Sequence, residues 1–280
     1  MSYKVLRKEK ITPLAFLLEV KDERAKRVKP GQYALVQWNE DAEPIPLSFL
    51  SVFENSYTFL IEVVGKTTLE MMELLEDEIK FIEAPCGSPF PVENYGKVLL
   101  ISKNWGIAPL INVGKALKEV GNEVYLIHVG EKEERVYLME EAGKEFEKVL
   151  LFTEDGSMGE EGNTEWAFRY FLENYEKPDL VVSAGSNLDG KIVSEMAKEK
   201  GIKHIAMVNA HILDANGLCL ACRVLVEDQE KLACIEGPWF EGDKVNWDYA
   251  IQKELFYREE EERALKEAIK QLSRLKTKRD

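Results

Sequence analysis

Residues 97–129, with the sequence KVLLISKNWGIAPLINVGKALKEVGNEVYLIHV, decide the fold class of this chain. The segment opens with an apolar run at 97–101, shows helical periodicity over 108–120, and returns to an apolar run at 123–129. A strand, a helix and a second strand in this order are typical of a parallel sheet with crossover helices. The alternation continues, with strands predicted at 149–152, 180–183 and 203–207 and helices at 137–146, 165–174 and 189–200. We therefore predict an α/β domain over residues 95–208.

Residues 1–94, which precede this domain, are rich in predicted β-structure. Turn residues such as Pro30-Gly31 separate short apolar or alternating runs at 3–6, 14–20, 32–38, 47–52, 57–64 and 79–82. One short helix is predicted at 67–75. Six strands at this spacing predict a small barrel.

Three of the four cysteines lie in a third predicted unit, residues 209–248. Asp214 is followed by Cys219, Cys222 and Cys234, and with Asp214 counted in place of a cysteine the spacing is that of plant-type two-iron clusters. Gly217 would supply the backbone angles that such a winding loop needs. Two other interpretations remain open. The three cysteines could bind zinc with His211 or Asp214 as the fourth ligand, or they could be reduced thiols without a metal.

The composition limits the partners of the chain. Its 280 residues carry a net charge of −14, from 37 basic and 51 acidic residues, which argues against nucleic acid or an anionic membrane as a partner. We find no stretch of about eighteen apolar residues and no signal peptide, so we expect a cytoplasmic protein. The tail over 249–280 is predicted to be one amphipathic helix, either solvated or in contact with a partner subunit.

A barrel, an α/β domain and a cysteine module in this order resemble the ferredoxin–NADP reductase-like electron-transfer subunits. Within that family the chain resembles the small subunit of NADH-dependent ferredoxin:NADP oxidoreductase, and the electron-transfer subunit of dihydroorotate dehydrogenase is a near relative. The resemblance rests on Lys29-Pro-Gly-Gln32, Ile45-Pro-Leu-Ser48, Val64-Gly-Lys-Thr-Thr68, Gly106-Ile-Ala-Pro109, Asp155-Gly-Ser-Met-Gly-Glu-Glu-Gly162, the Asp214–Cys222 loop with Arg223, and Ala233-Cys234.

This resemblance implies a set of cofactor sites. The barrel would bind FAD, with Pro46, Leu47 and Ser48 along the flavin. The turn that opens the following helix would lie under the pyrophosphate, where backbone amides and a lysine favour an anion; it comprises Val64, Gly65, Lys66, Thr67 and Thr68. An ordinary helix N-cap at Thr67 or Thr68 is the alternative interpretation of that turn. Gly106 would belong to a dinucleotide site, and a 2Fe-2S cluster would be bound by Asp214, Cys219, Cys222 and Cys234.

Two segments depart from the family pattern. Pro44 stands where the family has an arginine, so one charge-assisted contact to FAD is missing. The glycine-rich turn of the dinucleotide site reads Ser102-Lys103-Asn104-Trp105, and only Gly106 is retained. The chain therefore either binds NAD(P)(H) through a remodelled turn or has lost that site. Because the substituted positions need small residues for steric reasons, the second interpretation is favoured.

We therefore expect the electron-transferring subunit of a multi-subunit oxidoreductase, which passes electrons between FAD and the 2Fe-2S cluster. The resemblance implies a larger flavin and iron–sulfur partner similar to the glutamate synthase small subunit, contact with ferredoxin through the complex, and electron bifurcation by the whole assembly. The alternative is a non-catalytic assembly subunit with a zinc-stapled cysteine loop. We predict no catalytic residue, structural roles for His128 and His204, and a free buried thiol at Cys86.

Overall fold

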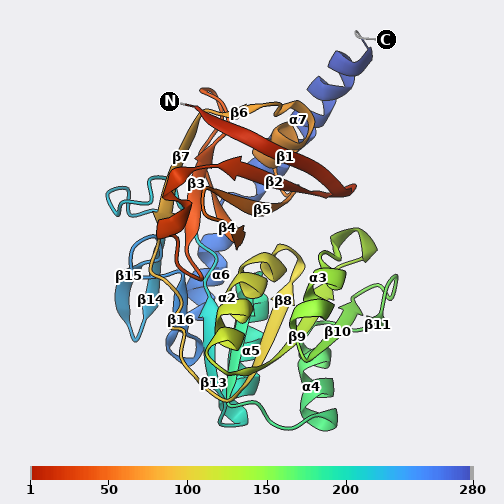
Figure 1. Ribbon diagram of the computed structural model, residues 1–280, viewed down its shortest axis with the longest axis vertical. Coiled ribbons are helices and arrows are strands. Elements are labelled where there is room, and N and C mark those ends of the chain that lie inside the picture. Colours follow the sequence, from red (N-terminus) through yellow and green to blue (C-terminus); the bar gives the residue numbers. More distant parts are fainter. Residues whose placement is uncertain (1, 278–280) are drawn as a thin grey trace.

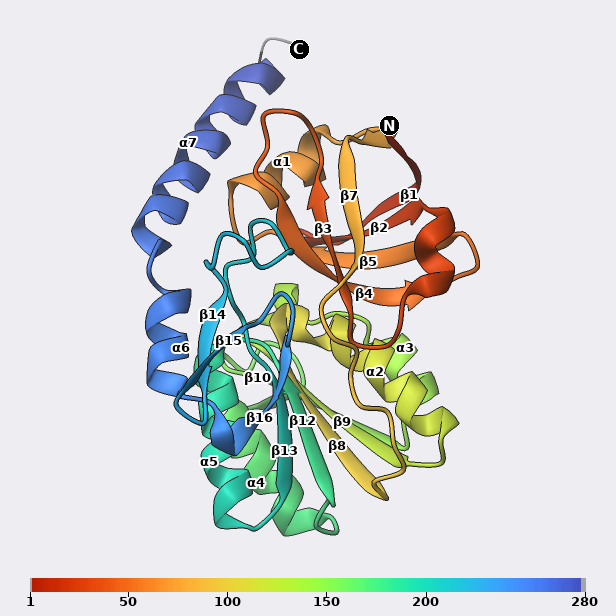
Figure 2. The same cartoon turned by 90° about the vertical axis from the view of Figure 1, so that its left-hand side faces the viewer.

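The computed structural model describes residues 2–277. A β-barrel lies above an α/β layer, and the cysteine-containing segment lies along one side where the two meet (Figure 1; Figure 2). The predicted combination of a barrel, a nucleotide-type α/β fold and a C-terminal module is confirmed by this arrangement.

The barrel is a nearly closed antiparallel sheet in the order β6-β1-β2-β5-β4-β3-β7. The predicted strand at 79–82 is in fact two strands, because the chain leaves β1 at one edge and joins β3 at the other, and so nearly closes the sheet. Alternate residues of β2 and β5, such as Phe16 and Phe59, fill the interior. The elements are β1 (Tyr3–Thr12), β2 (Ala15–Lys21), η1 (Glu23–Arg27), β3 (Tyr33–Gln37), β4 (Ile45–Val52), β5 (Ser56–Glu62), α1 (Lys66–Leu74), β6 (Glu78–Ile79) and β7 (Phe81–Cys86).

The second sheet has the order β11-β10-β9-β8-β12-β13-β16, and every neighbouring pair except β13 with β16 is parallel. The strands and helices predicted from the alternating pattern are all present. Together with η2, η3 and β11, which the pattern did not predict, the elements are β8 (Lys97–Lys103), η2 (Asn104–Gly106), α2 (Ile107–Glu119), β9 (Glu123–Gly130), η3 (Glu133–Arg135), α3 (Met139–Glu145), β10 (Lys148–Thr153), β11 (Glu160–Glu161), α4 (Thr164–Asn174), β12 (Leu180–Ala184), α5 (Asn187–Glu199) and β13 (Lys203–Met207).

Helices cover both faces of this sheet. Residues of α2 and α3 share one core cluster with the sheet, and residues of α4 and α5 share another. The first cluster also contains Ala15, Leu50 and Leu60 of the barrel, and α2 packs against β4. The barrel and the α/β layer therefore share one continuous core.

The segment after the cysteine loop contacts both the barrel and the α/β sheet. It contains β14 (Arg223–Val226), β15 (Gln229–Leu232), β16 (Trp239–Glu241) and η4 (Gly242–Lys244). β14 and β15 form a ribbon, whereas β16 adds an antiparallel strand to β13. The indole Nε1 of Trp239 donates to the carbonyl oxygen of Gly31 at 2.7 Å, and its ring packs edge-on against Phe90. The sequence pattern did not predict β16.

The tail is not the single helix that the sequence predicts. It forms α6 (Trp247–Glu254) and α7 (Arg258–Thr277), separated by a turn at 255–257. Trp247 and Ala250 bury α6 against the cysteine-containing module, and α6 also contacts α5, whereas α7 packs on α1 of the barrel (Figure 2). The two helices bind different surfaces, so the chain has to change direction between them.

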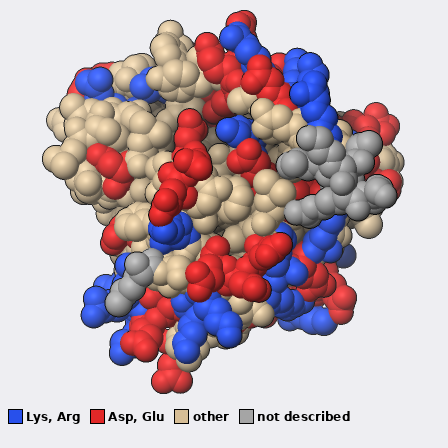
Figure 3. Space-filling model, turned by 90° about the horizontal axis from the view of Figure 1, so that it is seen from above, with Lys and Arg blue, Asp and Glu red and all other residues tan. Residues whose placement is uncertain are grey.

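Charged side chains of both signs lie on the barrel end of the molecule (Figure 3). On the face seen from the barrel end, acidic and basic side chains are intermixed, and the described ones form no continuous basic patch (Figure 3). None of the helices within residues 2–277 combines the length and the apolar character needed to cross a bilayer.

Candidate functional site

The cysteine loop winds tightly between β13 and β14. Ala215, Gly217 and Leu220 all have left-handed backbone angles, with φ of 53°, 80° and 56°. Such angles are uncommon outside glycine and turn the chain back on itself. Three of the predicted ligands, Asp214, Cys219 and Cys222, therefore lie on one short coil.

The four predicted ligands meet as two pairs. The Asp214 carboxylate accepts the backbone N–H of Cys219 at 2.7 Å, and the Cys222 sulfur accepts the backbone N–H of Cys234 at 3.4 Å. Cys219 is exposed, whereas Cys222 and Cys234 are each 1% exposed. Across residues 2–277, no three side chains of His, Cys, Asp or Glu converge closely enough to hold a metal ion. The pairs are assembled but do not converge on one point.

The donor chemistry fits a two-iron cluster. Three thiols and one carboxylate supply the ligand types that iron–sulfur clusters and iron accept, with one pair available for each iron. Burial and then the neighbouring Cys222 thiol raise the pKa of Cys234 to about 12, so a metal has to displace its proton. Desolvation, the largest single influence, raises the pKa of the Asp214 carboxyl, but hydrogen bonds from the backbone of Asn216, Cys219 and Leu218 together hold it below its usual value.

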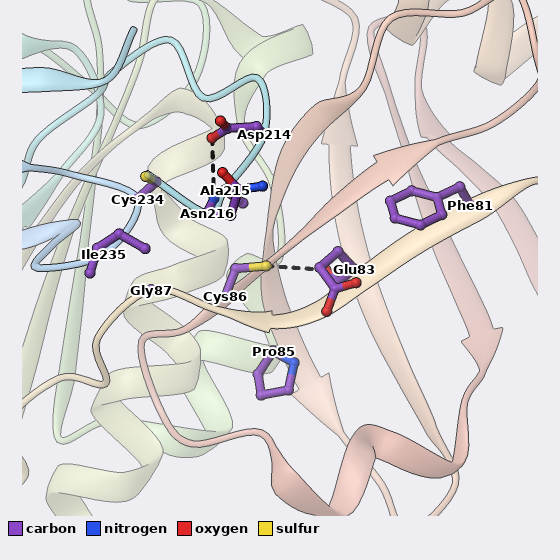
Figure 4. A pocket seen from close by; sticks show the side chains of 10 residues that line it. All are labelled: Phe81, Glu83, Pro85, Cys86, Gly87, Asp214, Ala215, Asn216, Cys234 and Ile235. Carbon is purple, nitrogen blue, oxygen red and sulfur yellow. Dashed lines mark hydrogen bonds between the residues drawn. The ribbon is translucent and has the colours of Figure 1, made fainter. Parts of the chain in front are cut away.

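A cavity of about 500 Å³ opens beside this loop (Figure 4). One wall is the end of β7 and the other is the cysteine module. The lining residues are Phe81, Glu83, Pro85, Cys86, Gly87, Asp214, Ala215, Asn216, Cys234 and Ile235. Cys86 is a free, buried thiol, as predicted.

The predicted flavin segment lies on β4. Pro46 is exposed and Ser48 is half-buried, while Leu47 between them is buried in the barrel. This alternation places Pro46 and Ser48 on the outer face of the barrel. They are available to a ligand lying along the strand.

The predicted pyrophosphate turn opens α1. Gly65 is the N-cap residue, and a Cβ added there would meet no atom within 4 Å. Thr68 accepts the backbone N–H groups of Val64 and Gly65 through its hydroxyl, at 3.1 and 3.2 Å. Neither Thr67 nor Thr68 is therefore the N-cap itself. The open space at Gly65 fits the close approach of a phosphate group to a helix N-terminus.

The predicted dinucleotide turn is occupied by contacts within the chain. Lys103 is buried and forms an ion pair with Glu154, and Asn104, with a φ of 47°, accepts the backbone N–H of Glu131 at 3.1 Å. A Cβ on Gly106 would lie 2.5 Å from the carbonyl carbon of Ala184. Gly106 is thus required by the packing of β12 against this turn.

A buried ion pair joins the two layers beside this turn. Arg135, the last residue of η3, pairs with Glu62 at the end of β5, and also lies 3.1 Å from the carboxylate of Glu131. Neither this pair nor Lys103 with Glu154 was predicted. The partners lie far apart in sequence and no local pattern links them.

The three histidines take structural positions. Ser102 and Ser183 hydrogen-bond to the buried rings of His128 and His204, and burial lowers their pKa values to about 4 and about 3. The structural interpretation of both is confirmed. The Nε2 of His211, the alternative ligand, lies 3.1 Å from the carbonyl oxygen of Lys253, so it is engaged at α6.

Known proteins of one kind resemble this chain over most of its length. Residues 209–246 match the family described as the iron–sulfur cluster binding domain of dihydroorotate dehydrogenase B. A Thermotoga maritima protein, a dihydroorotate dehydrogenase B (NAD(+)) electron transfer subunit homolog, is 37% identical over 252 residues, which cover 87% of this chain and 88% of the relative. The corresponding subunit of Clostridium perfringens is 26% identical over 242 residues, covering 86% and 96%.

Solved structures of related proteins are also similar to this chain. A chain of the NADH-dependent reduced ferredoxin-NADP oxidoreductase, studied for flavin-based electron bifurcation, superposes with a TM-score of 0.88 at 30% identity, covering 95% of this chain and 98% of that one. A ferredoxin reductase of carbazole 1,9a-dioxygenase, at 16% identity and a TM-score of 0.59, shares the fold over 72% of this chain. This chain belongs to the family of dihydroorotate dehydrogenase B electron-transfer subunits.

Proposed function

We propose that this chain is the electron-transfer subunit of a larger oxidoreductase and passes single electrons between FAD on the barrel and a 2Fe-2S cluster in the cysteine module. One observation carries the proposal. Three of the four proposed ligands lie on a tightly wound loop, where Asp214 accepts the backbone N–H of Cys219, and Cys222 accepts that of Cys234 in a core shared with Tyr33 of the barrel. Membership of an electron-transfer family supports it.

In the cluster site, each pair would bind one iron. Asp214 and Cys219 would serve one iron, and Cys222 and Cys234 the other. When bound, the cluster supplies one-electron chemistry. Cys222 and Cys234 sit in a buried core with Tyr33, which excludes water from that side. Asp214 and the exposed Cys219 face the solvent side, where a partner subunit can approach.

In the flavin site, Pro46 and Ser48 would line the isoalloxazine side of FAD, and the turn of Gly65 and Lys66 would receive its pyrophosphate. Lys66 is exposed and lies 3.9 Å from Glu70, so its ammonium group is free to turn towards a phosphate. The amides of the first turn of α1 have no partner within the helix. These features compensate in part for Pro44, which offers no hydrogen bond.

The proposal includes no dinucleotide at the turn formed by residues 102–106. Lys103 and Asn104 make contacts with Glu154 and Glu131 where a pyrophosphate would need the backbone. Electrons would therefore reach FAD from elsewhere in the complex. Calorimetric titration with NADH and with NADPH tests this point. Tight binding of either to this chain would show that the remodelled turn still accepts a dinucleotide.

We place the partner among larger flavin and iron–sulfur subunits similar to the glutamate synthase small subunit, with ferredoxin reached through the complex. Electron bifurcation would be a property of that assembly. The free thiols of the cluster loop persist in a reducing compartment, so the proposed location is the cytoplasm.

The test is a spectrum of the protein purified without oxygen. We expect flavin bands, iron–sulfur absorption, and iron and sulfide in equal amounts. Cys222→Ser should remove the iron–sulfur signal, whereas the matched variant His211→Ala should keep it, because His211 contacts Lys253 instead. A colourless protein that contains zinc would refute the proposal and favour the assembly subunit.

A further inference from the structure

The one cysteine that the proposed cluster does not use lies at the same cavity as two of its ligands. Cys86 ends β7 in the barrel, far in sequence from the cysteine loop. It nevertheless lines the cavity of about 500 Å³ together with Asp214 and Cys234 (Figure 4). A cysteine that had only to fill the barrel core would not need to face this cavity.

Burial places the same groups together. Cys86, Cys222 and Cys234 belong to one buried cluster with Tyr33. The hydroxyl group of Tyr33 donates to the carbonyl oxygen of Cys234 at 3.4 Å. The cysteine of the barrel and two cysteines of the module therefore share one core.

The Asp214 carboxylate would have to bind a metal while it accepts hydrogen bonds from the amides of its own loop. It accepts backbone N–H groups from Asn216 at 3.1 Å, Leu218 at 3.2 Å and Cys219 at 2.7 Å. Those bonds compete with iron for the same two oxygens. A thiolate is a softer ligand than a carboxylate and suits the irons of a sulfide cluster better.

The thiol of Cys86 makes only weak polar contacts. Its Sγ donates to the carbonyl oxygen of Glu83 at 3.3 Å and also forms a hydrogen bond with the backbone of Leu35. A thiol is a weak donor and a weak acceptor. Figure 4 shows the sulfur directed along β7 towards Glu83, beside the cavity. To bind an iron at the cavity, the sulfur would leave both contacts by a change of rotamer.

We propose that Cys86 is an alternative ligand of the iron that Asp214 binds. The inference rests on the proposed function, since it requires a cluster at this site. In the exchange, the iron–oxygen bond to Asp214 breaks and an iron–sulfur bond to Cys86 forms. The thiol proton passes to solvent water, because the loop amides keep the released Asp214 carboxylate ionised, and no electron is transferred. The two ligand states give the cluster two reduction potentials, because the ligand set tunes the metal.

Two variants test the proposal in protein purified without oxygen. Asp214→Asn keeps an oxygen acceptor for the loop amides, so the loop can fold, but its neutral amide is a poor iron ligand. We expect this variant to retain iron and sulfide through Cys86, with an electron paramagnetic resonance spectrum of the reduced cluster different from that of the natural chain. The double variant Asp214→Asn with Cys86→Ser should contain at least about tenfold less iron than the single variant Asp214→Asn.

A matched control uses Ser88, which lies just past β7 and donates to the carbonyl oxygen of Ile235. Asp214→Asn combined with Ser88→Ala disturbs the same cavity wall without removing a thiol, and should retain the iron. The proposal is overturned if Asp214→Asn already loses the cluster, or if the Cys86→Ser combination keeps the same spectrum as the single variant. If the natural chain itself contains no cluster, the proposed function fails instead.

Discussion

Gly106 and Gly65 both stand at predicted cofactor turns, but the structure separates their roles. A Cβ on Gly106 would lie 2.5 Å from the carbonyl carbon of Ala184, 2.9 Å from the backbone nitrogen of Gly185, and closer still to the Ala184 oxygen. These atoms belong to the end of β12 and cannot move alone. A Cβ on Gly65 would meet nothing within 4 Å.

Gly106→Ala should therefore destabilise the chain strongly. Overpacking in a core costs about 1–3 kcal/mol, and backbone neighbours on both sides put this site at the upper end. With about 2–4 °C per kcal/mol for a chain of this size, the expected loss is roughly 6–12 °C in the unfolding temperature. Gly65→Ala should change the free energy of unfolding by no more than about 0.5 kcal/mol, because a poorer N-cap is offset by a stiffer unfolded chain.

Thermal unfolding of the cofactor-free proteins, followed by circular dichroism, measures the first effect. We also expect Gly65→Ala to bind FAD more weakly than the natural chain. FAD titration followed by fluorescence measures that affinity. The reasoning is refuted if Gly106→Ala unfolds within about 2 °C of the natural chain, since β12 would then not constrain this turn. If Gly65→Ala binds FAD with unchanged affinity, the pyrophosphate does not bind at the N-terminus of α1.

Three further predictions concern buried polar groups. Arg135→Ala should lower the free energy of unfolding in urea by about 3 kcal/mol, because it leaves the Glu62 carboxylate buried without its partner. Adding Glu62→Gln to that variant should restore most of the lost free energy. His128 is buried with its pKa lowered to about 4, so the unfolded chain alone takes up this proton as the pH falls from about 6.5 to 4. The contribution of His128 to stability should therefore be constant above about pH 6.5 and fall below it. His204, whose pKa is also lowered by burial, contributes a slope of the same sign, so His128→Asn should reduce the acid-side slope and leave the part due to His204. Trp239→Phe should cost about 1–3 kcal/mol in the same urea assay, because the buried carbonyl oxygen of Gly31 loses its donor; a change below 0.5 kcal/mol would show that this bond contributes little.

Much of the fold follows from local patterns. The strands and helices of the α/β sheet were predictable because apolar residues recur with the period of each element. The tail was not, because its amphipathic period runs on through residues 255–257 and only the separate surfaces that α6 and α7 contact break it. β16 was missed for a similar reason, since a strand of three residues has no period and forms by pairing with β13.

The candidate site divides in the same way. Spacing along the chain placed Asp214, Cys219 and Cys222 on one winding loop, and their contacts with one another and with Cys234 agree with that spacing. The residues that close the dinucleotide turn were hidden, because Lys103 and Glu154 are brought together only by the pairing of β8, β9 and β10.

The sequence by itself therefore determined the order of the units, the residues proposed as cluster ligands and the identity of the altered turn, because these depend on spacing and residue size along one stretch of chain. Three contacts were decided by the tertiary structure alone. Gly106 packs against the end of β12, Arg135 of the α/β layer pairs with Glu62 of the barrel, and Cys86 lines the same cavity as Asp214. Each of these contacts joins segments that are remote along the chain. Such contacts arise only when the sheets close and pack, and no local period encodes them.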